Sequence, residues 1–143
     1  MNVIAIRSSG NKTCICAIIK DDVVQYSIKH ERKDRPDWSE MFSNVGLDSF
    51  FKLDDIDIFS YANNSSSYTA TRSIAAYLKG VTSAIGKPLI VIDSENIDSL
   101  DSDVIAKKAL EKFINSKEDI KAFSPDIANP IYSSIPQYKK VNE

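Results

Sequence analysis

Two cysteines and a single histidine are the residues of this chain that first suggest chemistry. Cys14 and Cys16 lie two residues apart in an apolar run typical of a β-strand, so both side chains share one face and are poor disulfide partners. A zinc site needs further ligands, and the chain has one histidine, His30, and no second cysteine pair. We therefore expect both cysteines to be core residues, because free cysteine is among the most buried residue types.

Hydroxyl and carboxyl groups cluster at other places without the spacing of a catalytic site. The serines at positions 65–67 have no histidine or lysine at a spacing typical of a serine nucleophile and its base. We interpret them as residues of a turn and as helix caps. Asp54, Asp55 and Asp57 are candidate metal ligands by residue type, but Asp54 and Asp55 precede a predicted strand and we expect these two to face water. His30 begins the charged run of residues 30–37, which is typical of a solvated loop.

The turn after the first predicted strand is the strongest candidate for an anion-binding site. It brings together Arg7, Ser8, Ser9 and Lys12 at the end of a strand, where α/β folds bind ligands. The alternative is that these residues form only a polar hairpin turn.

Composition restricts the classes of protein to which the chain belongs. Its 143 residues suffice for one core, and 43% hydrophobic and 27% charged residues with a formal net charge of -2 favour neither disorder nor nonspecific polyanion binding. Lysines and arginines are spread along the chain, so the pattern locates no nucleic-acid contact surface. No apolar run reaches the roughly 20 residues that span a bilayer, and the N-terminus does not resemble a signal peptide. We expect a cytoplasmic protein without a membrane segment.

The N-terminal part predicts three antiparallel strands followed by a helix. Residues 3–6, 13–19 and 23–29 have strand patterns, and the short connection at 20–22 is typical of a hairpin. A helix is expected from residue 38, where Asp37 caps its start, Glu40 completes a reciprocal capping box and Gly46 ends it. A short helical turn at 48–52 and a strand at 56–62 come next.

The longest helix is expected between the polar turn at residues 63–67 and Gly86. Ser66 or Ser67 caps its start, while Gly86 and the following Pro88 end it. Four residues at helical spacing form one buried stripe, namely Ile74, Leu78, Val81 and Ile85.

The remaining elements complete a βαβ unit and a C-terminal part. Residues 89–92 predict a strand parallel to residues 56–62, joined to it by a right-handed crossover. A loop at 93–103 leads to a helix at about 103–115. An extended tail is expected at 124–143, with Ile131 and Tyr132 docked on the body.

This order of elements resembles a lobe of the actin-like ATPases, which have a ribonuclease H-like fold with a mixed five-stranded sheet and helices. Specific segments resemble the bacterial TsaB (YeaZ) family: MNVIAI at 1–6, WSE at 38–40, IDIFSYA at 56–62, and SYTATR, LKGV and GKPLIVIDS within 67–94. The register holds without a gap from residue 56 to residue 94. The last helix and PIY at 130–132 resemble the end of the family's chain. The resemblance implies an N-terminal lobe at 1–94 and, at 95–143, a helix and tail that are the remnant of a largely missing second lobe.

Two departures from the family pattern concern nucleotide binding. Arg7 stands where the family has an aspartate, and residues 64–70 read NSSSYTA where the family reads GPGSFTG, so three glycines are lost. In actin-like ATPases that carboxylate helps to hold metal and phosphates, and glycines let the backbone approach a phosphate closely. We therefore expect no cofactor and no metal.

The resemblance implies a non-catalytic scaffold subunit that supports N6-threonylcarbamoyladenosine (t6A) formation on tRNA. Its implied partners are a TsaD-like protein, which performs the chemistry, and a TsaE-like protein, with tRNA bound only indirectly and a homodimer in isolation. Two helices that resemble the family's paired interface elements supply the contact residues, which by position are Trp38, Met41, Phe42, Val45, Thr69, Arg72, Ser73, Ala76, Tyr77 and Gly80. The alternative for Trp38, Met41 and Phe42 is a place in the core.

Two other functions remain open at this point. The chain is alternatively a homodimeric interaction module that has lost the t6A role, or a small nucleotide-binding enzyme of the actin-like superfamily. A dimer that captures no TsaD-like protein favours the first, and tight binding of ATP with magnesium favours the second.

Overall fold

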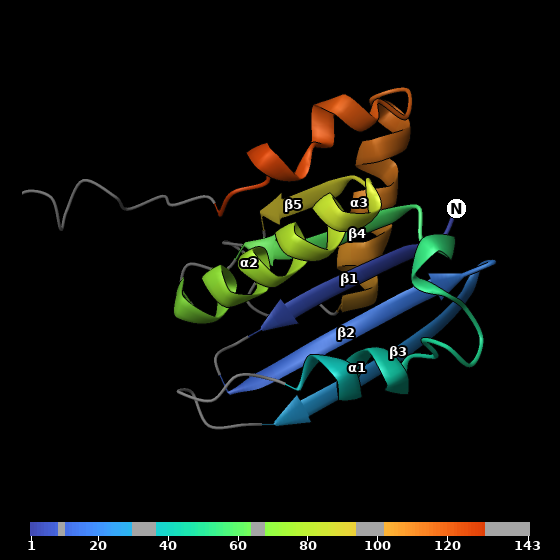
Figure 1. Cartoon of the computed structure of the whole chain (residues 1–143), viewed down its shortest axis with the longest axis vertical. Coiled ribbons are helices and arrows are strands. Elements are labelled where there is room, and N and C mark those ends of the chain that lie inside the picture. The colour runs from blue at the N-terminus through green and yellow to red at the C-terminus, as the bar shows by residue number, and fades with distance from the viewer. Residues whose placement is uncertain (9–10, 30–36, 64–67, 94–101, 131–143) are drawn as a thin grey trace, which may run out of the picture.

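A mixed five-stranded sheet organises the chain. The computed structural model describes residues 1–8, 11–29, 37–63, 68–93 and 102–130, without the side chains of residues 68 and 69. The strands are β1 (Val3–Ser8), β2 (Lys12–Ile19), β3 (Asp22–Lys29), β4 (Ile58–Asn63) and β5 (Leu89–Asp93), in the order β3-β2-β1-β4-β5. The first three pair antiparallel, whereas β4 pairs parallel with both β1 and β5 (Figure 1). The predicted meander and βαβ unit are confirmed.

Helices cover both faces of the sheet. α1 (Trp38–Asn44) and α2 (Tyr68–Ile85) pack on one face, and α3 (Ser102–Asn115) packs on the other (Figure 1). Successive residues of a strand point to opposite faces, so Ile4 and Ile6 meet α1 and α2, while Val3 and Ala5 meet α3. Because β1 and β4 are covered on both sides, residues 3–6 of β1 are a continuous apolar run and all six residues of β4 are buried, including Ser60 and Asn63. None of the helices in the described ranges is long and apolar enough to cross a membrane.

α2 has the buried stripe that its sequence predicts. Ile74 and Leu78 are buried, whereas Val81 and Ile85 are half-buried at the margin of the same core. The helix ends where expected, because Gly86 adopts a φ of +69°, in the left-handed region that favours glycine. The predicted serine caps lie outside the described residues.

Gly86 and Gly80 provide a matched pair of substitutions with opposite expected signs. Gly86→Ala forces a side chain into the left-handed region, so we expect it to destabilise the protein by about 1 kcal/mol. Gly80→Ala lies within α2, with no atom within 4 Å of an added Cβ, and should stabilise by up to about 1 kcal/mol. Urea unfolding measures both, and two changes of the same sign would contradict the assigned helix end.

The start of α1 agrees with its prediction in the cap and departs from it in the capping box. Asp37 caps the helix, since its carboxylate accepts from the Glu40 backbone N–H at 3.0 Å. The Glu40 carboxylate accepts from the Tyr26 hydroxyl at 3.2 Å, so it joins the helix to β3 instead of completing the capping box. Desolvation, and after it the Glu40 carboxylate, raises the pKa of Tyr26.

The helical turn predicted at residues 48–52 is wrong. Asp48 has a φ of +65°, and Leu47 forms an isolated parallel bridge with Phe51, so the chain makes a tight turn there. The turn directs Phe51 into the core and leaves Phe50 85% exposed. A short 3-10 helix, η1 (Leu53–Asp55), follows it.

The extended tail predicted from residue 124 is wrong for its described part, residues 124–130. Two 3-10 helices, η3 (Ile120–Phe123) and η4 (Pro125–Ile127), return the chain to the body. Ala128 is buried, and its carbonyl accepts a buried hydrogen bond of 2.9 Å from the Tyr61 hydroxyl of β4. Residues 131 and 132 lie outside the described residues.

The two cysteines have different environments, and both are free thiols. Cys16 is fully buried beneath α3, as predicted. Cys14 is half-exposed, and its sulfur accepts from the Ser27 hydroxyl at 3.2 Å, so the prediction of a core position is wrong for it. The difference arises because α3 covers Cys16 and Ile18 further along the same face of β2.

Candidate partner-binding surface

α2 is held on the sheet between two flanking contacts. On one side, the Tyr77 ring stacks on Trp38 of α1, with ring centroids 4.5 Å apart and an interplanar angle of 10°. Phe42 of α1 approaches the same tyrosine at 6.0 Å with a tilted ring. On the other side, the Lys79 ammonium donates to the Asn129 side-chain oxygen just after η4. These contacts leave the outward face of α2 between them.

The outward face carries exposed residues at helical spacing, and all of them except Arg72 are small. Arg72, Ala76 and Gly80 follow one another at intervals of four residues, and all three are exposed. Ser83 and Ala84 extend the same face and are also exposed, so we define the α2 strip as Arg72, Ala76, Gly80, Ser83 and Ala84. The sequence interpretation omitted Ser83 and Ala84. Helical spacing could have identified them, because Ser83 lies seven residues after Ala76 and Ala84 lies four residues after Gly80. Small side chains allow another backbone to approach closely.

An aromatic pair borders the α2 strip. Trp38 and Tyr77 are both half-buried, so each ring combines a packed face with an accessible edge. Burial raises the pKa of the Tyr77 hydroxyl above its ordinary value. Tryptophan and tyrosine are enriched where proteins contact one another, because they bury much area with few rotatable bonds. Ser73, beside this pair on α2, is half-buried as well.

The other aromatic and aliphatic residues predicted on α1 belong to the core. Met41, Phe42 and Val45 are 0%, 2% and 2% exposed and pack against the sheet and α2. These three residues are therefore core residues rather than partner-binding residues, because their own chain already buries their side chains. Thr69 is the second residue of α2, and its side chain is not among those that the structure describes.

The predicted anion-binding residues do not converge. Arg7 and Ser8 are neighbours on β1, so their side chains point to opposite faces of the sheet. Ser8 is buried, donates to the Lys12 carbonyl at 3.5 Å and accepts from the Thr13 hydroxyl at 3.1 Å. Arg7 is half-exposed and Lys12 exposed, and Ser9 lies outside the described residues. The hydroxyl of Ser8 thus serves the hairpin.

The aspartates near β4 have structural partners. Asp57 accepts from the Asn2 backbone N–H at 2.8 Å, and Asp55 accepts from the Lys52 N–H at 2.8 Å. Asp54 is exposed, as expected. Within the described ranges, no group of three or more histidine, cysteine, aspartate or glutamate residues is placed to hold a metal ion.

Solved structures share the fold of this chain. No protein-family model and no curated protein matches the sequence. One similar structure is YeaZ from Pseudomonas aeruginosa, at a TM-score of 0.59 and 12% identity, covering 64% of this chain and 43% of that chain. A second, described as an uncharacterized protein with similarity to peptidase YeaZ from Pseudomonas aeruginosa, has the same score, identity and coverage. The chain therefore has a YeaZ-like fold of the actin-like, ribonuclease H-like class and spans less than half the length of either structure.

Proposed function

We propose that this chain is a TsaB-like scaffold that binds a TsaD-like protein through the α2 strip and the adjoining Trp38–Tyr77 pair. The observation that carries the proposal is the two-sided construction of α2. Its inner side holds the helix in the core through Ile74 and Leu78, while its outer side presents Arg72 and four small residues beside two stacked aromatic rings. A rigid helix with an accessible outer side suits a partner helix.

The proposal assigns the chemistry of t6A formation to the partner. The YeaZ-like fold supports a TsaB-like role, and the residues of the α2 strip supply contact area rather than acid, base or nucleophile. A TsaE-like protein would join the same cytoplasmic complex, and tRNA would be contacted indirectly. The chain would thus be a non-catalytic subunit.

The proposal also assigns parts to the two ends of the chain. Residues 1–94 would correspond to the N-terminal lobe of the TsaB family, and residues 95–143 to a remnant of the second lobe. The packing of α3 against β1, β2 and β4 is compatible with this division, because it gives the C-terminal part a place on the sheet.

A charge on the α2 strip tests the partner surface. Ala76→Glu places a carboxylate at the centre of the strip, and we expect it to weaken the complex with a co-expressed TsaD-like protein at least 100-fold, about 2.7 kcal/mol. The affinity is measured by titration of the purified proteins. Because Ala76 is exposed, the free energy of unfolding should change by less than about 0.5 kcal/mol.

Ala122→Glu is the matched control, since Ala122 is also an exposed alanine but lies in η3. We expect this variant to bind as the wild type does. Retention of the complex by Ala76→Glu would count against the mapped surface. A wild-type chain that forms a homodimer and captures no TsaD-like protein would instead favour the interaction module without the t6A role.

A further inference from the structure

β3 is an edge strand with an accessible backbone. It lies at the end of the order β3-β2-β1-β4-β5 and pairs with β2 alone among the described residues. The hairpin between them closes through Lys20 and Asp21, both with positive φ, and pairs Ile19 with Asp22. A two-residue turn of this kind closes on a hydrogen-bonded pair, so Asp22 and every second residue after it bond to β2. The backbone groups of Val23, Gln25 and Ser27 therefore point away from the sheet.

The sequence of β3 lacks the usual protection of an edge. Between Asp22 and Lys29 the strand reads VVQYSI, six residues without a charge or a proline, and Val23 and Val24 are 43% and 40% exposed. Monomeric proteins commonly place charges, prolines or bulges on such strands. The opposite edge differs, because β5 has five residues and its Val91 carbonyl accepts from the Lys112 ammonium of α3 at 3.4 Å.

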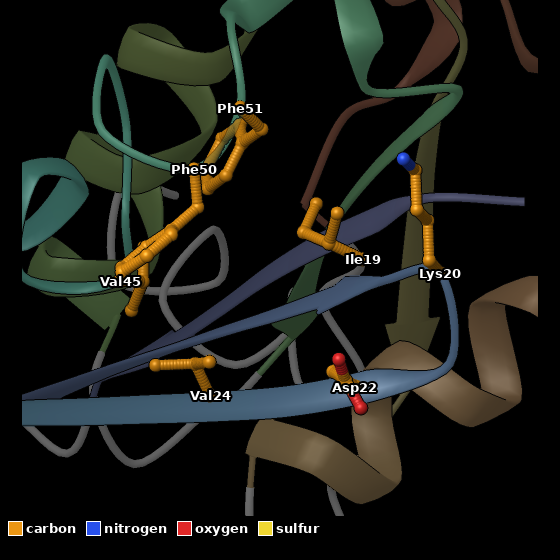
Figure 2. A pocket seen from close by; sticks show the side chains of 7 residues that line it. All are labelled: Ile19, Lys20, Asp22, Val24, Val45, Phe50 and Phe51. Carbon is orange, nitrogen blue, oxygen red and sulfur yellow. The ribbon is translucent and has the colours of Figure 1, made fainter.

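An apolar groove runs beside this edge on the face that carries α1. It has a volume of about 350 Å³ and is lined by Ile19, Lys20, Asp22, Val24, Val45, Phe50 and Phe51. Figure 2 shows Val24 on the floor of the groove, with Val45 and the two phenylalanines on the side opposite β3. Phe50 is 85% exposed, so an apolar surface continues from the edge strand onto the turn after α1.

We propose that β3 pairs antiparallel with β3 of a second copy of this chain, about a two-fold axis at Gln25. An antiparallel pair with two-fold symmetry places a residue opposite itself. Centring at Gln25 sets Asp22 opposite the partner subunit's Ile28 at each end of the ladder. Lys29 then lies beside the partner subunit's hairpin turn, which contains Asp21, so opposite charges come near each other at both ends. On the groove face, Val24 lies opposite the partner subunit's Tyr26, an aliphatic and aromatic pair that stabilises sheets. Centring at Tyr26 would set Val23 opposite the partner subunit's Lys29 and move each lysine away from the other copy's hairpin turn. The result is one continuous sheet of ten strands, formed by an element other than the α2 strip.

Charge reversal at the proposed axis tests this arrangement in the full chain. Gln25 is exposed, so Gln25→Lys and Gln25→Glu each place like charges directly across the axis. We expect each variant alone to raise the dissociation constant of the dimer about tenfold or more, measured by sedimentation at concentrations up to about 1 mM. An equimolar mixture of the two variants should restore dimers, because opposite charges then face each other.

Two further measurements complete the test. Circular dichroism melting checks whether both Gln25 variants are folded. The check is needed because Gln25→Lys loses the 3.1 Å hydrogen bond that Gln25 accepts from the Ser102 hydroxyl. Ala76→Glu on the α2 strip should leave the dimer intact. A wild-type chain that stays monomeric up to about 1 mM overturns the proposal. So does a dimer that resists both Gln25 variants, one that Ala76→Glu disrupts, or a mixture that stays as monomeric as its components.

Discussion

Leu78→Ala is expected to lower the free energy of unfolding by about 2–5 kcal/mol. Leu78 is 0% exposed and lies at the centre of the inner side of α2, between the helix and the sheet. Its truncation removes buried apolar area and leaves a cavity that rigid strands on one side cannot fill. Because a domain of this size is stable by only about 5–15 kcal/mol, the loss is a large fraction of the total. Urea unfolding followed by circular dichroism measures it.

The comparison with Ala76→Glu separates the two sides of the helix. Leu78→Ala should reduce stability strongly while the folded fraction still binds the partner, whereas Ala76→Glu should reduce binding and leave stability nearly unchanged. The two residues are neighbours in sequence but lie on opposite sides of α2. Similar unfolding free energies for both variants would contradict the assigned inner side.

Cys16 is expected to make the fold sensitive to alkaline pH. Burial, and after it the Asp103 carboxylate, raises the pKa of the Cys16 thiol from 9.0 to about 12, with Lys107 acting in the opposite direction. Between these values the unfolded chain releases a proton that the folded chain retains, so stability falls as pH rises. The stabilisation from the protonated thiol is constant below about pH 9 and is lost progressively as the pH rises toward 12.

The measurement is the pH dependence of urea unfolding in the wild type and in Cys16→Ala. The variant is less stable at neutral pH, because it loses buried volume, but its stability should decline less steeply above pH 9. Cys14→Ala is the matched control and should keep the steep decline, since Cys14 is half-exposed. Equal slopes in all three proteins would contradict the buried state of Cys16. A thiol reagent should likewise modify Cys14 in the folded protein and Cys16 only after unfolding.

Local patterns predicted most elements because each is encoded within a few residues. The 3.6-residue spacing from Ile74 to Ile85, followed by Gly86, placed the end of α2 at the observed residue. The hairpin at Lys20 and Asp21 and the Asp37 cap are equally local, since turns and caps depend on the residues that form them. The turn at 48–52 was missed because two adjacent phenylalanines are compatible with either a helix or a turn. The structure forms a turn because it buries Phe51 and leaves Phe50 exposed.

The proposed contact surface was harder to predict, because an apolar helix face has the same sequence pattern whether it packs against its own sheet or against a partner protein. One side of α1 carries Trp38, Met41, Phe42 and Val45. The sequence does not reveal whether this side packs against the sheet of its own chain or against a partner protein. The structure places three of them in the core and leaves Trp38 at the margin against Tyr77. The divergence of Arg7 and Ser8 follows from strand alternation, which the sequence already contained.

The sequence by itself determined the order of the strands and helices, the antiparallel meander with its βαβ unit, and the inner side of α2, because propensities, turn residues and periodicity act over short distances. Only the tertiary structure decided that Ala128 returns to Tyr61, that β3 has an accessible edge, and that the outward side of α2 lies between Trp38 and Asn129. These features depend on contacts between residues far apart in the chain. Their free energy comes from burial and packing, which no local pattern specifies.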